Sequence, residues 1–187
     1  MTQAEIKQLI QKQRTFFHSD ATLDVEYRIH ALQKLKACIL KYENEINIAI
    51  RADLGKCAFE SYMCETGLVL SELTYMLKHT RKFSKERTVR TPLAQFHSRS
   101  YQKPSPYGVT LIMSPWNYPF MLTIEPLIDA LAAGNTAILK PSAYSAHTTA
   151  LISRMIQECF DEKYVAVVTG GREENNFLLN EHFEARK

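Results

Sequence analysis

The chain has 187 residues, of which 45% are hydrophobic and 23% are charged, and that composition and length are ordinary for a single globular domain. Its net charge of +3 is too small to indicate a nucleic-acid partner. The amino terminus is polar, and no apolar run is long enough to cross a bilayer. We therefore expect no signal peptide and no membrane span, and we predict a cytoplasmic location.

The sequence gives no sign of a metal site. The four cysteines, at positions 38, 57, 64 and 159, lie far apart without a C-x-x-C pair, and the six histidines are equally scattered. Cys38 and Cys159 fall among apolar residues of helical segments, where a free cysteine behaves as a small buried hydrophobe. The basic stretch from Lys78 to Lys103 is interpreted as a solvated helix end followed by an exposed strand.

Helices are expected over the first half of the chain. Apolar residues between Ile6 and Phe17 predict a short amphipathic opening helix. From Leu32 to Ala49 such residues recur at intervals of three and four, which predicts one long helix that ends near Gly55. A third helix is indicated between Tyr62 and Phe83. Residues 1–97 are therefore expected to form a helical front to the domain.

The pattern changes at residues 98–107, SRSYQKPSPY, which alternate in polarity and contain two prolines. Proline cannot donate a hydrogen bond to a neighbouring strand, so this segment suits an edge or outlying strand better than a central one.

From residue 108 onward, strands and helices alternate. Short apolar runs predict strands at 109–114, 136–140 and 164–169, and helical patterns lie between them at 119–133 and 145–159. A further helix is indicated over 173–180, after the Gly170-Gly171 turn. This β-α-β-α-β order predicts an α/β fold in which residues 108–187 form the first half of a doubly wound parallel sheet, with helices on both faces. We also expect an exposed apolar sheet edge beyond 164–169.

A ligand of such a sheet is expected at the carboxyl ends of the strands. The turn after the first strand reads SPWNYP, however, so the G-x-G-x-x-G fingerprint of a conventional dinucleotide site is absent. Periodicity alone indicates no more than an α/β domain.

Three ordered motifs are more specific: PWNYP at 115–119, the PL and ALAAGN segments within 126–135, and LKPS at 139–142. They resemble the aldehyde dehydrogenase superfamily. LGK at 54–56, VTGG at 168–171 and the helical front resemble it too, and the stretch FFHSDATLDVEYRIHALQKLK is most similar to the class 3, fatty-aldehyde-type branch. The resemblance implies the amino-terminal part of that fold, with 98–107 as a protruding strand of the kind that joins subunits, and a homodimer.

The resemblance also implies an activity, the NAD- or NADP-dependent oxidation of a small-molecule aldehyde to a carboxylate. In that family a cysteine thiolate attacks the aldehyde, a hydride leaves to the nicotinamide, and a glutamate-activated water hydrolyses the thioester. Asn117 matches the asparagine that donates a hydrogen bond to the oxyanion. Its alternative role is to cap the helix that follows, because asparagine is a strong N-cap.

The expected cofactor site comprises Ser114, Pro115, Trp116, Lys140, Pro141 and Ser142. By resemblance, Lys140 would bind the adenosine ribose, and the alternative is an ordinary exposed lysine. Trp116 would line the cofactor groove, or it would pack in the core.

Two departures from the family pattern matter. The family usually has an acid after KPS, where this chain has Ala143, so the choice between NAD and NADP stays open. No cysteine matches the motif of the nucleophile, and no general-base glutamate motif is present. We therefore expect weak or absent cofactor binding and no turnover by these residues. The alternative is a non-catalytic nucleotide-binding or subunit-interaction module.

Overall fold

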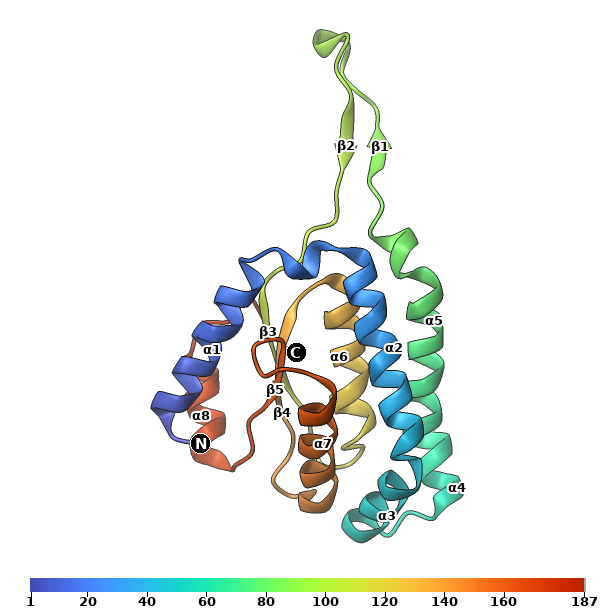
Figure 1. Cartoon of the computed structure of the whole chain (residues 1–187), viewed down its shortest axis with the longest axis vertical. Coiled ribbons are helices and arrows are strands. Elements are labelled where there is room, and N and C mark those ends of the chain that lie inside the picture. Colours follow the sequence, from blue (N-terminus) through green and yellow to red (C-terminus); the bar gives the residue numbers. More distant parts are fainter. Residues whose placement is uncertain (187) are drawn as a thin grey trace.

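The computed structural model describes residues 1–186, and its chain is helical up to Phe83 (Figure 1). The opening helix is α1, Gln3–Phe17, and it begins with a capping box in which Thr2 and Glu5 exchange hydrogen bonds. A short 3-10 turn, Ala21–Leu23, leads to α2, Val25–Lys41, which Asp24 caps. The other helices of this part are α3, Glu43–Leu54; α4, Ala58–Ser61; a π-helical turn, Tyr62–Thr66; and α5, Gly67–Phe83.

The single long helix expected up to Gly55 was wrong, because the chain breaks at Tyr42. This residue has φ −98° and ψ 8°, outside the helical range, and it separates α2 from α3. The apolar stripe keeps its spacing across the break, so both helices bury residues in one core, among them Ile39 and Ile46. A periodic pattern alone therefore could not reveal the break.

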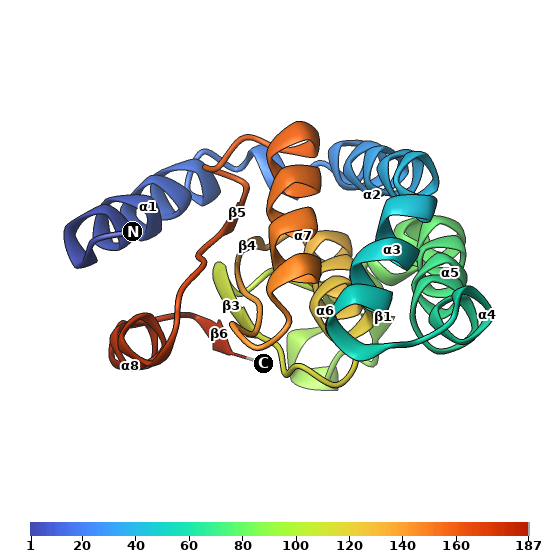
Figure 2. The same ribbon diagram turned by 90° about the horizontal axis from the view of Figure 1, so that it is seen from below.

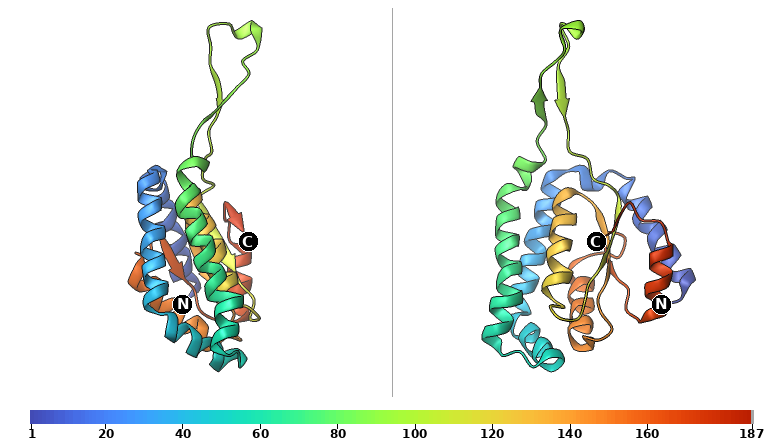
Figure 3. Two further views of the ribbon diagram at one scale, coloured as in Figure 1. Left: turned by 90° about the vertical axis from the view of Figure 1, so that its right-hand side faces the viewer. Right: turned by 180° about the vertical axis from the view of Figure 1, so that it is seen from behind.

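A two-stranded hairpin projects from the body beyond α5. Strand β1, Arg87–Val89, pairs antiparallel with β2, Ser100–Gln102, and a 3-10 turn, Leu93–Gln95, lies near its tip. The hairpin stands clear of the helices in Figure 1 and in both views of Figure 3. The sequence indicated the second strand and missed the first, because β1 has only three residues and all of them are exposed.

The body is built on a parallel sheet of strand order β5-β4-β3-β6. Its strands are β3, Val109–Met113; β4, Thr136–Lys140; β5, Val165–Val167; and β6, Ala185–Arg186. The connecting helices are α6, Met121–Ala133; α7, Ala146–Cys159; and α8, Arg172–Asn180. The doubly wound parallel arrangement expected from the sequence is therefore confirmed. β6 pairs on the far side of β3, so the strand order reverses between these two strands.

Helices cover both faces of this sheet, as Figure 2 shows from below. On one face, α1 and α8 pack against alternate strand residues such as Leu111 and Ile138. On the other face, α6 and α7 pack against the intervening residues, such as Ile112 and Leu139, and α2, α3 and α5 lie beyond them. Since successive side chains of a strand point to opposite faces, strands buried on both sides read as continuous apolar runs.

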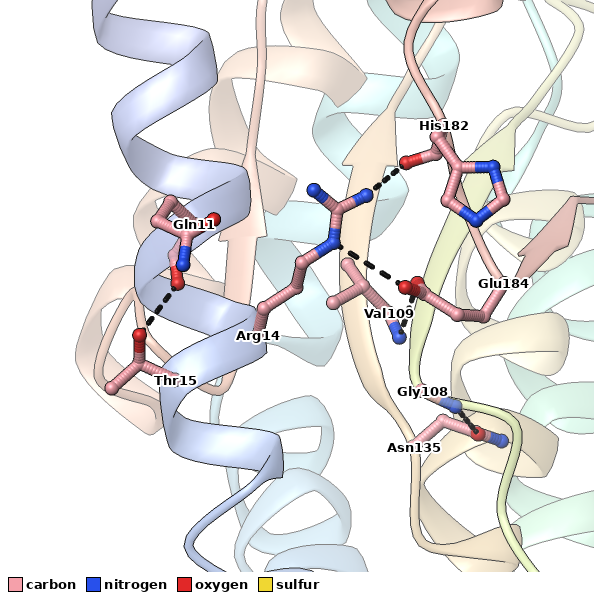
Figure 4. Close-up of polar contacts among 8 residues, drawn as sticks. All are labelled: Gln11, Arg14, Thr15, Gly108, Val109, Asn135, His182 and Glu184. Atoms are coloured by element: carbon pink, nitrogen blue, oxygen red, sulfur yellow. Dashed lines mark hydrogen bonds and ion pairs between the residues drawn. The ribbon is translucent and has the colours of Figure 1, made fainter.

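Polar contacts attach the last described residues to the start of β3 (Figure 4). Arg14 of α1 donates hydrogen bonds to the backbone carbonyl of His182 and, at 3.3 Å, to Glu184. The other carboxylate oxygen of Glu184 accepts from the backbone N–H of Val109 at 3.1 Å. Asn135, just after α6, accepts from the backbone N–H of Gly108 at 3.0 Å. These contacts fix where β3 enters the sheet and hold β6 beside it.

The sheet edge expected beyond 164–169 is present, but the expectation that it exposes apolar side chains was wrong. β5 is an edge strand of the sheet, but Val165 and Ala166 are buried. An edge strand exposes backbone groups, whereas its side chains point to the two faces, and here helices cover both faces.

Candidate functional site

A cavity of about 770 Å³ opens where β3 and β4 end and α8 begins. Its volume lies within the range of small-molecule sites in proteins, which is roughly 300 to 1,000 Å³. It is lined by Met113, Ser114, Pro115, Lys140, Pro141, Ser142, Ala143, Tyr144, Gly171, Arg172, Asn175, Asn176 and Leu179. Five of the residues expected from the sequence for the cofactor site therefore share one cavity, namely Ser114, Pro115, Lys140, Pro141 and Ser142.

Ser114 shapes the chain where it leaves β3. Its side chain is buried, and its hydroxyl lies 2.5 Å from the hydroxyl of Thr123 on α6. Thr123 in turn donates to the backbone carbonyl of Pro119 at 2.6 Å. This chain of hydrogen bonds closes the loop between β3 and α6 upon itself, so Ser114 contributes to the shape of the cavity wall.

Lys140 is not an ordinary exposed lysine. It is the last residue of β4 and is only 3% exposed. Its ammonium donates to the carbonyl oxygen of Gly170 at 2.8 Å and to that of Pro141 at 3.0 Å. Burial lowers the pKa of Lys140, and the nearby Glu174 partly opposes this effect. A lysine held by two carbonyls at a cavity wall presents a positioned cation to whatever enters.

Ser142 forms the turn between β4 and α7. Its carbonyl accepts from the hydroxyl of Thr149 at 2.9 Å, and its own hydroxyl accepts from the N–H of Tyr144 at 3.2 Å. Ala143, which the family pattern would replace with an acid, is exposed at the cavity. The turn therefore presents a small apolar side chain at this point of the wall.

Trp116 and Asn117 lie outside that lining, in the exposed loop 115–118 that follows β3. Trp116 is 55% exposed, so it does not pack in the core. Asn117 does not cap α6 either: the N-cap position is Phe120, and the carboxylate of Glu65 accepts from the N–H groups of Phe120 and Met121 at 2.9 and 3.3 Å. The capping alternative for Asn117 is therefore excluded by the geometry of this helix end.

Carboxylates occupy the N-termini of all three helices that follow β3, β4 and β5. Glu65 fills that of α6. Asp53 accepts from two N–H groups at the start of α7, those of His147 at 3.0 Å and Thr148 at 2.7 Å. Glu174 of α8 accepts from the N–H of Gly171 at 2.7 Å. A helix N-terminus is the usual phosphate site of such folds, and these three already hold an anion.

An anion in the cavity would therefore be bound by side chains. Among the described residues that line the cavity, the charged ones are Lys140 and Arg172, and both are cations. Three further lining residues were not expected from the sequence, namely Arg172, Asn175 and Asn176 from the first turns of α8. The Gly170-Gly171 turn, at the carboxyl end of the third strand, was the signal that could have directed attention to them.

Two of the four cysteines, Cys38 and Cys159, do not line this cavity. Cys38 and Cys159 are buried, and Cys38 lies on α2 while Cys159 ends α7. Contact with Cys38 and burial both raise the pKa of the Cys159 thiol, which keeps it protonated at neutral pH. No group of three or more His, Cys, Asp or Glu within residues 1–186 is arranged to hold a metal ion. None of the helices in that range is long and apolar enough to cross a membrane.

A parallel sheet of this order, with a cavity at the carboxyl ends of its strands, defines the doubly wound α/β class. The model of the "Aldehyde dehydrogenase family" matches residues 1–187, and the chain belongs to that family.

Individual proteins of the family show how similar the chain is to known members and how much of their length it spans. The chain is 41% identical over 179 residues to 4,4'-diaponeurosporen-aldehyde dehydrogenase of Staphylococcus aureus, covering 96% of this chain and 39% of that protein. It is 34% identical over 175 residues to aldehyde dehydrogenase family 3 member A2 of Rattus norvegicus, covering 94% and 36%. The structure titled "Substrate bound state of Staphylococcus Aureus AldH" superimposes with a TM-score of 0.91 at 42% identity, covering 93% of this chain and 38% of that one. The chain thus spans about two fifths of the length of these relatives.

Proposed function

We propose that residues 1–187 form the cofactor-binding side of an NAD(P)-dependent aldehyde dehydrogenase, an enzyme that oxidises an aldehyde to a carboxylate. The observation that carries this proposal is the cavity in which the ends of β3 and β4 meet the start of α8, with Lys140 held in its wall. Family membership supplies the reaction class.

The cavity fits the adenosine end of a dinucleotide. Its volume of about 770 Å³ and its position at the carboxyl ends of the strands suit a nucleoside. The third N–H of the Lys140 ammonium, beyond the two bonded to Pro141 and Gly170, would donate to a ribose hydroxyl. The walls around the ribose would be formed by Ser114, Pro115, Pro141 and Ser142. When bound, the nicotinamide supplies the two-electron acceptor for aldehyde oxidation.

The charge of the cavity favours NADP at least as much as NAD. A carboxylate beside the ribose binds its hydroxyls and repels a 2′-phosphate, whereas a nearby arginine accommodates that phosphate. Here the expected acid is replaced by Ala143, and Arg172 lines the same cavity. We therefore infer that Arg172 adds affinity for the 2′-phosphate and that Ala143 removes the repulsion.

Asn117 would supply the oxyanion donor. A neutral amide fixed near the reacting carbonyl stabilises the developing negative charge without competing for protons, and removing such a donor typically costs about 100- to 1,000-fold in rate. Glu65, rather than Asn117, satisfies the start of α6, which leaves the Asn117 amide for this role.

The hairpin β1–β2 is the proposed subunit contact of a homodimer. Leu93 and Phe96 near its tip are 87% and 77% exposed, so the projecting hairpin offers apolar surface that a second subunit would cover. Light scattering of Leu93→Asp and Phe96→Asp against the unaltered chain tests this: a dimer that dissociates in both variants supports it, and an unchanged mass contradicts it.

Calorimetric titration with NAD and NADP tests the cofactor site. Lys140→Ala should weaken both ligands, Arg172→Ala should weaken only NADP, and Arg81→Ala, which removes a cation from α5, should change neither. A preference for NAD that survives both cavity substitutions would show that the ribose is bound elsewhere.

Residues 1–187 alone should not reduce either cofactor with an aldehyde, because the family's nucleophile motif matches none of their cysteines. Cofactor reduction that is aldehyde-dependent and disappears in a single Cys→Ser variant would contradict this.

A further inference from the structure

The exposed loop 115–118 is tied to the helical front by one buried ion pair. The ammonium of Lys56 lies 2.7 Å from a carboxylate oxygen of Glu65, and the two side chains are 11% and 0% exposed. Lys56 follows α3, whereas Glu65 belongs to the π-helical turn Tyr62–Thr66. We call this pair the clamp.

Each member of the clamp holds a different part of the chain after β3. Lys56 donates to the backbone carbonyl of Asn117 at 3.1 Å, and its ammonium lies 4.0 Å from the centre of the Tyr118 ring. Glu65 accepts from the N–H groups of Phe120 and Met121. The clamp therefore binds the loop at Asn117 and Tyr118 and again at the first turn of α6.

The cost of burying the Glu65 carboxylate makes the clamp select one position of the loop. A carboxylate removed from water is stable only when its acceptor sites are satisfied, and Glu65 has one cation and two backbone donors. Displacing the loop would remove all these partners except Lys56. The carboxylate therefore favours one position of the loop. An apolar contact of similar size would not, because it has no directional bonds to break when the loop shifts.

The π-helical turn explains how Glu65 reaches this position. The N–H of Gly67 bonds to the carbonyl of Tyr62, five residues earlier, which inserts one extra residue into the helix. The extra residue rotates the following side chains relative to a regular helix. Such turns recur at functional sites, and this one directs an acid at the loop that carries Asn117.

We propose that Lys56 and Glu65 are positioning residues that fix the backbone of Asn117 and so preorganise its side-chain amide as a hydrogen-bond donor. The inference rests on the proposed function for what the amide binds, but the order of the loop is a property of the chain itself. A donor to a developing oxyanion must be held in place before the reaction, because reorganisation during it consumes the stabilisation.

The test uses the double variant Lys56→Met/Glu65→Gln, which removes both charges together so that neither is left buried and unpaired. The readouts are the side-chain NH₂ resonances of Asn117 and the fluorescence anisotropy of Trp116, the only tryptophan in the sequence. We expect the Asn117 resonances to broaden and the Trp116 anisotropy to fall while the circular dichroism of the folded protein is unchanged.

Two further variants make the result specific. Lys12→Met/Glu162→Gln makes the same substitutions at an exposed ion pair and should leave both readouts unchanged. Should the double variant fail to fold, Glu65→Gln keeps the size of the side chain and an acceptor for Phe120, and it should still broaden the Asn117 resonances because it releases Lys56.

The possible outcomes separate this inference from the proposed function. Unchanged Asn117 resonances and Trp116 anisotropy in a folded clamp variant would overturn the clamp, whatever the protein binds. NADP binding that neither Lys140→Ala nor Arg172→Ala weakens would instead contradict the proposed cofactor site. NADP binding that persists in the clamp variant is expected, since neither clamp residue lines the cavity.

Discussion

Replacing Lys140 with methionine should weaken nucleotide binding with only a modest loss of stability. The ammonium makes two hydrogen bonds to carbonyls, at 2.8 and 3.0 Å, and hydrogen bonds of charged groups contribute about 1.5 to 3 kcal/mol each. The desolvation that lowers the pKa of Lys140 offsets much of this gain. We therefore expect the free energy of unfolding to fall by about 1 to 2 kcal/mol, measured by urea denaturation.

The same substitution, Lys140→Met, should have a larger relative effect on NADP affinity than on stability. One charge-assisted hydrogen bond to a ribose hydroxyl is worth about 1.5 to 3 kcal/mol, which corresponds to roughly 10- to 100-fold in the dissociation constant of NADP. Isothermal titration calorimetry at pH 7 would measure it, with Lys78→Met, an exposed lysine of α5, as the matched control. An affinity within twofold of the unaltered chain would refute the role assigned to Lys140.

The pH dependence of stability and of NADP affinity gives an independent check of Lys140, because the two quantities should change in opposite directions. Because the folded-state pKa of Lys140 is lowered, the unfolded chain binds this proton more tightly, so the stability of the unaltered protein rises as the pH increases from the folded to the unfolded pKa. NADP affinity should fall over the same interval, because the ammonium is lost there. Both trends should be absent in Lys140→Met, and their persistence in that variant would assign them to another group.

Three further substitutions test the supports of the site. Gly170→Ala should be destabilising, because Gly170 has φ 138° and an added Cβ would lie 2.3 Å from the carboxylate carbon of Glu174; an unchanged melting temperature would show that this turn relaxes freely. Asp53→Ala should cost about 1 kcal/mol by urea denaturation, because it uncaps α7, and a neutral result would mean that water replaces the carboxylate. Leu139→Ala, at a fully buried position of β4, should cost about 2 to 5 kcal/mol, and a cost below 1 kcal/mol would contradict the packing described.

Much of the sheet could be predicted from the sequence, because its strands are buried on both faces. The run TAILK has no polar residue before Lys140 except Thr136, and β4 covers the same five residues. The end of α6 was equally clear, since Gly134 adopts φ 94°, a conformation that suits glycine. These signals are local, so the pattern of a few neighbouring residues is sufficient.

The parts that could not be predicted depend on contacts between distant segments. Glu65 and Phe120 are 55 residues apart, and nothing near either residue indicates that the carboxylate completes the start of α6. Asp53 likewise caps a helix that begins more than 90 residues later. The π-helical turn has no simple sequence signature. Arg172 can be assigned to the cavity only once α8 is placed beside the ends of β3 and β4.

The site residues were therefore predicted unequally. The motif LKPS identified the cavity wall formed by Lys140, Pro141 and Ser142. These residues are consecutive, because the end of a strand and the turn after it are adjacent in the sequence. Of the motif PWNYP, Pro115 and Trp116 were expected to line the same groove, yet only Pro115 reaches the cavity, and Trp116 lies beyond its lining. The direction of a loop depends on what anchors it, and here the anchors lie in the helical front.

The most direct test of the account is to map NADP binding by backbone amide NMR on the unaltered chain. We predict that the resonances that shift with NADP concentration will cluster at the cavity, in residues 113–114, 140–144 and 171–176. Shifts centred instead on the groove between α3 and α7, around Ile48, His147 and Arg154, would contradict the assignment of the carboxyl ends of the strands as the cofactor site.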